Sequence, residues 1–167
     1  MQNRQVLSLG LANLTTHLMD MIMRTQEVLC PTDFSATAAH ALKYAVEMAN
    51  FYQVNIRLLH VTSPSRSAHF YGVAVETPAS LEEALATFVE AKMQTLQQEM
   101  QRDLAAGLSI KTVIRHGDVS EEILAESADV GMVVIASHGC SGLADFLKPH
   151  VSQDIVKLAK CPVLVVK

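Results

Sequence analysis

Short apolar runs alternate with segments of helical periodicity along most of the chain. The runs consist mainly of Val, Ile and Leu with little polar alternation, which is typical of strands covered on both faces. They lie at residues 27–30, 55–61, 110–115, 132–137 and 163–167. This strand–helix alternation predicts a doubly wound α/β fold built on a five-stranded parallel sheet.

Four segments between the runs carry apolar residues at the spacing of a buried helix face. The first follows Ser35, a favourable N-cap residue, and its predicted inward residues are Ala38, Ala41, Leu42, Ala45 and Ala49. The second is predicted at about 80–106, with a stripe of Leu81, Leu85, Phe88, Leu96, Met100 and Leu104. The third begins near Ser120 and turns Ile123 and Leu124 inward. The fourth carries Val151, Ile155, Leu158 and Ala159. One long irregular stretch is predicted at 62–79, and a loop of that length is either functional or mobile.

The N-terminal residues form a separate segment in this prediction. Leu11, Leu14 and Leu18 recur at helical spacing, which indicates a short amphipathic helix packed on the domain or on a partner subunit. The alternative is an over-long start, because Met23 and two earlier methionines could each begin a shorter chain. The segment is too polar to span a bilayer and lacks the pattern of a signal peptide. The predicted organisation is therefore an extension at 1–25 and one domain at 26–167.

Composition and charge narrow the classes of partner. The 167 residues are half hydrophobic and 18% charged, which suits one domain with a buried core. The net charge is −4 and there is no long basic run, so neither nucleic acid nor an anionic membrane is expected as a partner. The three cysteines form no CxxC pair, which favours a reducing cytoplasm over a disulfide framework.

Motifs follow the ends of the predicted strands, where doubly wound sheets bind their ligands. The segments "VLCPTDFSATAAHALKYAVEMA", "LLHV", "HGDVSEEIL", "VVIASHGCSGL" and "CPVLVV" occur in this order. Together they resemble the universal stress protein family over about residues 26–167. The resemblance implies an adenine-nucleotide alpha-hydrolase-like fold with strand order 3-2-1-4-5. It also implies a cytoplasmic homodimer paired through the last strand, Pro162 to Lys167, and, in one branch of the family, a bound ATP.

That strand order places the first and fourth strands side by side, so that "PTDFS" and "SHGCSG" face each other across a cleft. Asp33 matches the acidic family residue that meets the nucleoside, and its carboxylate suits adenine or ribose donors. The same residue could instead cap the first helix or bond the turn backbone. Val61 matches the family residue that packs on adenine, although a lone Val is also a core residue. The candidate binding residues are Pro31, Thr32, Asp33, Val61, Ala136, Ser137, His138, Gly139, Gly142, Pro149, His150 and Val151.

The glycine motif departs from the ATP-binding branch, which has Gly-x-x-Gly, nine residues, and then Gly with Ser or Thr. Ala136 stands at the first glycine, Gly139 is kept, and Pro149-His150 replaces the final pair. Gly142 helps the segment turn but does not substitute for that pair. Proline suits the start of a helix but has no N–H for a phosphate oxygen. The loss of one charge-assisted bond of about 1.5–3 kcal/mol weakens affinity on the order of ten- to several-hundred-fold.

Two functional hypotheses follow from this departure. In one, the protein is a degenerate nucleotide-binding stress protein with weak ATP or AMP binding. In the other, it is a nucleotide-free dimeric interaction module. We do not expect an enzyme, because no P-loop or G-x-S-x-G motif is present. We also expect no metal site, since Cys30, His138 and Cys140 lack close ligand spacing.

The N-terminal extension can be tested by truncation. If residues 1–22 form an amphipathic helix, their leucines must be buried against the domain or a partner, so a chain that begins at Met23 should lose thermal stability or solubility. Thermal melts of the full-length and shortened chains measure this. An unchanged melting temperature with unchanged solubility would contradict the helix and favour the over-long start.

Overall fold

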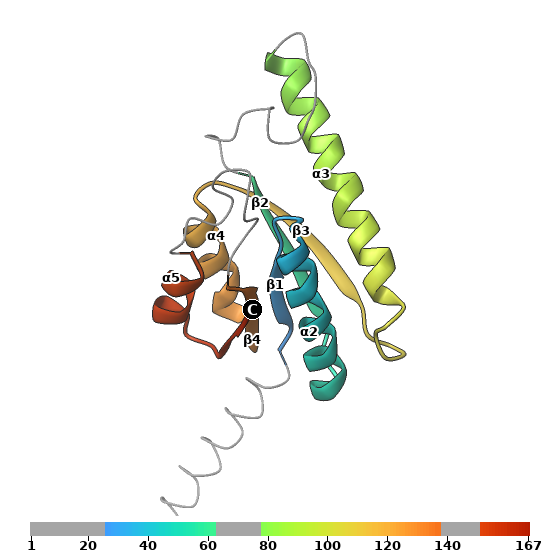
Figure 1. The fold of residues 1–167 in the computed structure, drawn as a ribbon, viewed down its shortest axis with the longest axis vertical. Helices are drawn as coiled ribbons and strands as arrows, with labels where there is room; N and C mark the ends of the chain where they lie inside the picture. The colour runs from blue at the N-terminus through green and yellow to red at the C-terminus, as the bar shows by residue number, and fades with distance from the viewer. Residues whose placement is uncertain (1–25, 63–77, 138–150) are drawn as a thin grey trace, which may run out of the picture.

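The computed structural model describes residues 26–62, 78–137 and 151–167. Within these residues, five strands form one sheet with the order β3-β2-β1-β4-β5, and every neighbouring pair is parallel (Figure 1). The strands are β1 (Val28–Pro31), β2 (Ile56–Thr62), β3 (Ile110–His116), β4 (Met132–Ala136) and β5 (Val163–Val166). The predicted fold class and strand order are therefore confirmed, and each strand bound lies within one residue of its predicted run.

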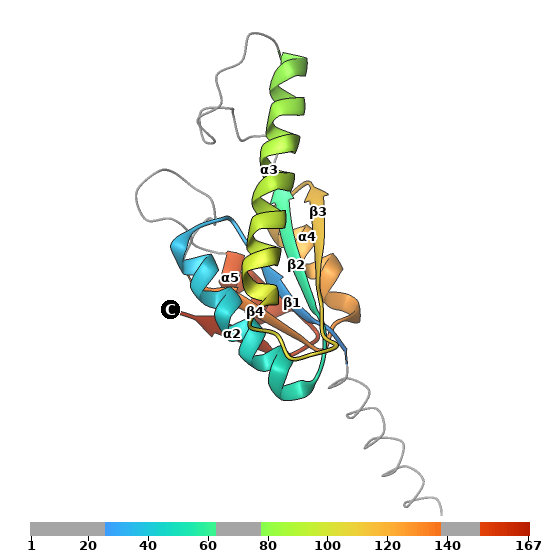
Figure 2. The same ribbon diagram turned by 90° about the vertical axis from the view of Figure 1, so that its right-hand side faces the viewer.

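Helices cover both faces of the sheet (Figure 2). On one face lie α2 (Ala36–Tyr52) and α3 (Pro78–Gln101), whose residues share a core cluster with the strands. On the other face lie α4 (Val119–Glu126) and α5 (Val151–Leu158), with a second cluster, and a 3₁₀ turn (Ser127–Asp129) follows α4. This arrangement explains why β1, β2 and β4 read as near-continuous apolar runs, since the side chains on both faces of these inner strands are buried. The edge strand β3 is only partly buried.

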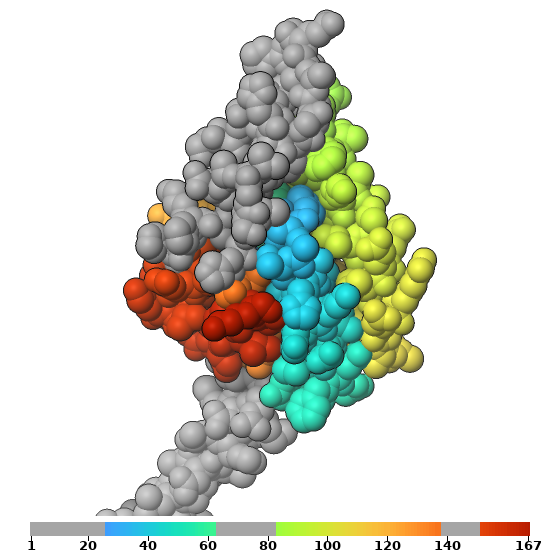
Figure 3. All heavy atoms as spheres, in the orientation of Figure 1, coloured from blue at the N-terminus to red at the C-terminus, as the bar shows by residue number. Residues whose placement is uncertain are grey.

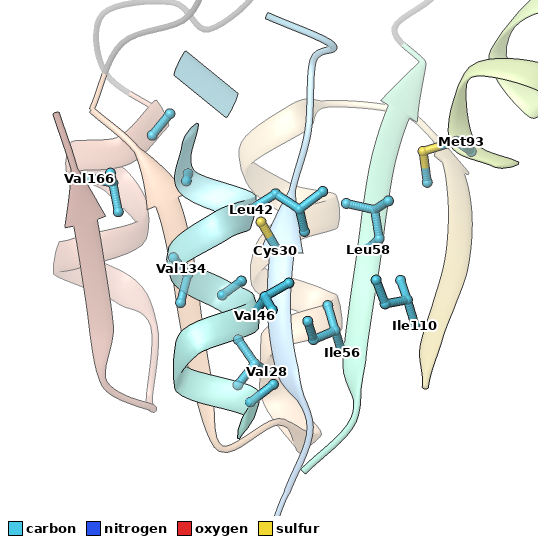
Figure 4. Packing of buried hydrophobic residues seen from close by; sticks show 14 of the residues in the cluster. Val28, Cys30, Leu42, Val46, Ile56, Leu58, Met93, Ile110, Val134 and Val166 are labelled. Atoms are coloured by element: carbon cyan, nitrogen blue, oxygen red, sulfur yellow. The ribbon is translucent and has the colours of Figure 1, made fainter. Parts of the chain in front are cut away.

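The first core cluster fills the layer between the sheet and the helix pair α2 and α3 (Figure 4). Leu42 and Val46 of α2 pack over β1, and Met93 of α3 packs beside β2 and β3. The predicted inward residues of α2 are all buried. None of the helices in the described parts of the chain is long and apolar enough to cross a membrane.

The long helix α3 differs from its prediction. It ends at Gln101 instead of 106, and its deepest residues are Val89 and Met93, which the predicted stripe omitted. The end has a local cause, because the Gln101 side chain donates to the Leu108 carbonyl and accepts from Ile110 N–H. Gly107 then turns the chain at φ +90°, a conformation that side chains rarely adopt.

Two further expectations change at element ends. Of the stretch predicted to be irregular at 62–79, Thr62 belongs to β2 and the last two residues belong to α3, which begins at Pro78. The rest of that stretch lies outside the described residues. In α5, Val151 and Ile155 are buried, whereas Leu158 is 63% exposed. The buried face of α5 thus stops one turn before the helix does.

An ion-pair network ties the amino-terminal end of the sheet to α4. Arg57 of β2 contacts Glu27 at 2.8 Å, Glu126 at 3.0 Å and Asp129 at 2.8 Å. Arg115 of β3 also pairs with Glu126, at 2.5 Å. Partial burial alone would lower the pKa of Arg57, but hydrogen bonds to the three carboxylates raise it. The bond to Arg57 in turn holds the pKa of Asp129 below its usual value.

The shift at Asp129 predicts a pH-dependent stability difference. When folding lowers the pKa of a carboxyl group, the ionised group stabilises the folded state at pH values above its pKa in the unfolded chain. This stabilisation is lost as the pH falls through the pKa of the group in the folded state. Asp129→Asn should therefore cost about 0.2–1 kcal/mol at pH 7, because the side chain is exposed. The difference from the parent should shrink below about pH 4. Urea unfolding across this range measures it, with Asp103→Asn as a charge-matched control. A constant difference across the range would contradict the account.

Candidate ligand-binding site

The candidate site lies at the carboxyl ends of β1 and β4, where the order of the sheet changes direction. The chain leaves β1 through α2 on one face of the sheet, whereas α5 follows β4 on the other face. Adjacent strands with divergent connections open a crevice between them. The crevice has an empty volume of about 380 Å³, part of it open to solvent, with walls from β1, β2, β4, α2 and α4.

The segment Thr32–Ser35 connects β1 to α2 and is held by its own side chains. The Thr32 hydroxyl accepts from Phe34 N–H at 3.1 Å, and Asp33 Oδ1 accepts from Ser35 N–H at 3.0 Å. Ser35 Oγ accepts from Ala38 N–H at 3.0 Å and caps α2, as its sequence position predicts. Asp33 therefore bonds the turn backbone through one oxygen, while Ser35 is the N-cap residue of the helix.

The second carboxylate oxygen of Asp33 is the most informative atom of the crevice. Asp33 Oδ2 is buried and has no hydrogen-bond partner among the described residues. A buried acceptor left without a donor costs about 1–3 kcal/mol. Because Asp33 lines the crevice, a ligand that brings an N–H or O–H to Oδ2 would recover this cost. The turn-bonding and ligand-binding roles weighed for Asp33 thus use different oxygens and are compatible.

The other described candidates fall into two groups. Pro31, Thr32, Val61 and Ala136 line the crevice with Asp33. The remaining two, Ser137 and Val151, are not among the residues that line the crevice and instead hold the surrounding structure together. Ser137 N–H donates to the Val166 carbonyl at 2.7 Å and the Ser137 carbonyl accepts from Ser152 Oγ at 3.1 Å. Val151 belongs to the second core cluster. The candidates His138, Gly139, Gly142, Pro149 and His150 lie outside the described residues.

Five further residues line the crevice that were not among the candidates from the sequence, and two of them, Ala38 and Leu59, are core residues. Val119 and Ile123 reach it from α4, and His60 reaches it from β2. The sequence analysis named Ile123 only as an inward helix residue, and His60 occurs there only within the motif "LLHV". The available signal is the adjacency of β1 and β2, which places His60 beside the Thr32–Ser35 turn.

Cys30 lies close to the site in sequence but points into the first core cluster, beside Leu42 (Figure 4). Complete burial raises the pKa of its thiol to about 12, so the reactive thiolate is scarce at neutral pH. Of the three residues considered for a metal site, Cys30 alone belongs to the described residues. Within those residues there is no group of three potential metal ligands.

The doubly wound parallel sheet with a crevice at its switch point defines a class of α/β proteins that bind ligands at that edge. A model of the universal stress protein family matches residues 24–167, and the chain belongs to this family. It is 30% identical to Universal stress protein MJ0577 of Methanocaldococcus jannaschii over 161 residues, covering 88% of this chain and 98% of that protein.

Solved structures agree with the fold. The structure of MJ0577 superimposes with a TM-score of 0.67, covering 86% of this chain and 96% of that chain at 30% identity. UspA from Lactobacillus plantarum gives a TM-score of 0.66, covering 86% of this chain and 98% of that chain at 24% identity. The relatives are thus matched over nearly their whole length.

Proposed function

We propose that this universal stress protein binds an adenine nucleotide weakly in the crevice between β1 and β4, chiefly through the nucleoside, and does so without catalysis. The observation that carries the proposal is the buried Asp33 Oδ2, which lacks a donor among the described residues. An adenine amino group or a ribose hydroxyl is such a donor. The apolar side chains of Leu59, Val61 and Ala136 offer the kind of surface on which a flat base packs.

Structural relatives support the same ligand class. Two solved structures with this fold are of universal stress proteins in complex with cAMP and with dAMP. They share only 17% and 16% identity with this chain, with TM-scores of 0.61 and 0.58, so the likeness is one of fold. For this chain, Asp33 and the crevice support nucleotide binding, and the relatives favour adenine as the base.

The part of the proposed site that would meet the phosphates should contribute little to the affinity. Helix α5 begins at Val151, so Pro149 and His150 directly precede it in the sequence. A helix start donates backbone N–H groups to phosphate oxygens, but proline has none to give. Nucleoside contacts then supply most of the affinity, and the outer phosphates of ATP should add little beyond AMP.

The proposed function is tested by titrating AMP into the parent and into Asp33→Asn. An asparagine keeps an oxygen for the Ser35 N–H but places an amide donor where Oδ2 now accepts. The loss of one hydrogen bond to a charged group should weaken AMP binding about tenfold or more. Asp103→Asn removes the same charge just after α3, outside the residues that line the crevice and outside the Arg57 network, and should bind as the parent does. The proposal would be refuted if the parent bound no AMP at millimolar concentration, or if Asp33→Asn bound AMP with the same affinity as the parent.

A second titration tests the degenerate phosphate site. The double variant Pro149→Gly, His150→Ser restores the N–H that proline lacks and adds a hydroxyl, each bond contributing about 1.5–3 kcal/mol before the flexibility of glycine is subtracted. Calorimetry with Mg²⁺ should show at least about tenfold tighter ATP binding than the parent, with a much smaller gain for AMP. Low-micromolar ATP binding by the parent, or no gain in a folded double variant, would contradict this assignment.

The second candidate function, a nucleotide-free dimeric interaction module, is favoured by the edge strand. Strand β5 is the last strand of the sheet and lies at the surface between α5 and α2 (Figure 3). Val165 is 37% exposed on it. An apolar edge strand invites pairing with another chain. We propose a homodimer paired antiparallel through Pro162 to Lys167, compatible with either function, and a cytoplasmic location in keeping with the free thiols of Cys30 and Cys161.

Light scattering at micromolar concentration should give twice the 18.2 kDa chain mass. Val165→Glu should shift the protein to monomer, because the carboxylate would be placed in the proposed interface, whereas Val163 packs on the core and is a poor site for this test. Lys111→Glu on the opposite edge strand is the control and should leave the dimer intact. A monomeric parent would contradict the interface, as would a dimer that Val165→Glu leaves unchanged.

A further inference from the structure

The turn that carries Asp33 contains a residue in an unfavourable conformation. Phe34 has φ +64°, in the left-handed region that bulky side chains rarely adopt. Such a conformation persists only where the surrounding structure imposes it, and it clusters at functional sites. Phe34 directly follows Asp33, so whatever holds Phe34 also sets the direction of the Asp33 carboxylate.

Side chains within the turn supply part of this restraint. The Thr32 hydroxyl accepts the N–H of Phe34, and Asp33 Oδ1 accepts the N–H of Ser35. These bonds are local, and each joins residues two positions apart. They fix the shape of the turn but do not anchor it to the rest of the sheet.

Two contacts anchor the turn to the neighbouring strand β2. Thr32 N–H donates to the Leu59 carbonyl at 2.8 Å, and the side-chain anchor is His60, which is 1% exposed near the carboxyl end of β2. Its Nδ1 lies 2.8 Å from the carbonyl oxygen of Thr32. Because a carbonyl can only accept, Nδ1 carries the proton and donates. The imidazole ring also stacks on the Phe34 ring, with centroids 4.4 Å apart and an angle of 29° between the planes. One side chain therefore holds the residues on both sides of Asp33.

We propose that His60 is a positioning residue for the nucleotide site, acting through Asp33. Its ring fixes Thr32 and Phe34, and thereby directs Asp33 Oδ2 toward the crevice. The inference rests on the proposed function for its ligand, but its structural part concerns only the turn. His60 also lines the crevice, so direct contact with the ligand is the rival explanation that the experiment must separate.

His60→Phe keeps an aromatic ring against Phe34 and removes the donor to Thr32. AMP binding, followed by NMR titration well below the melting temperature of each variant, should weaken about five- to tenfold. His60→Asn offers a donor at a similar position to Nδ1, so it should keep more affinity than His60→Phe. The matched control is His40→Phe on α2, where the histidine is exposed and packs edge-on against Tyr44. It should bind AMP as the parent does.

A double-mutant cycle separates positioning from direct contact. If His60 acts through Asp33, adding His60→Phe to Asp33→Asn should cause little further loss of AMP affinity. If His60→Phe weakens AMP binding as much in the Asp33→Asn background as in the parent, the proposal is overturned in favour of direct contact between His60 and the ligand. Unchanged AMP affinity in His60→Phe overturns it as well.

The ligand-free protein provides a readout that does not depend on nucleotide binding. Because Ser35 N–H donates to Asp33 Oδ1, its amide resonance and exchange rate report the position of the carboxylate. His60→Phe should shift this resonance and speed its exchange, whereas His60→Asn and His40→Phe should leave both nearer to the parent. A parent that binds no AMP refutes the proposed function, and the Ser35 amide then decides the positioning role alone. A Ser35 amide that His60→Phe leaves unchanged overturns it.

Discussion

The short turn between β1 and α2 is the constraint on which the candidate site depends. Four residues, Thr32–Ser35, end the central strand, start the helix that covers it and present a carboxylate to the crevice. Their backbone is held in an unfavourable left-handed conformation at Phe34 by bonds from Thr32, Asp33 and Ser35 and by the ring of His60. The cost of this geometry makes sense if the turn serves to aim Asp33, because a relaxed turn would cap α2 equally well.

The rest of the fold supplies a rigid frame for that turn. Core clusters on both faces bury the sheet, and the Arg57 network fixes the opposite end of β2 to α4. Strand β2 thus carries Arg57 near one end and His60 near the other. Helix α4, which this network holds at Glu126, brings Val119 and Ile123 to the wall of the crevice. The site is therefore built on regular elements, with one turn carrying the polar group.

Strand positions were accessible from the sequence, because buried parallel strands leave apolar runs that stand out from helical periodicity. The strand order came from the resemblance to the universal stress protein family. Helix ends were less accessible. The bonds of the Gln101 side chain end α3, and no periodicity in the sequence signals them. The motif "PTDFS" indicated Asp33, but its two oxygens could not be told apart before their surroundings were known. The role of His60 depends on the pairing of β2 with β1 and on the φ angle of Phe34, which a linear pattern does not contain.

The central claim is that Asp33 Oδ2 accepts a hydrogen bond from an adenine nucleotide in the crevice. A crystal structure of the protein grown with saturating AMP tests this most directly. The account predicts the nucleoside between β1 and β4, with an adenine amino group or ribose hydroxyl within hydrogen-bond distance of Oδ2 and with Oδ1 still bonded to the Ser35 N–H. An empty crevice at saturating AMP, or a nucleoside bound with no contact to Asp33, would contradict it.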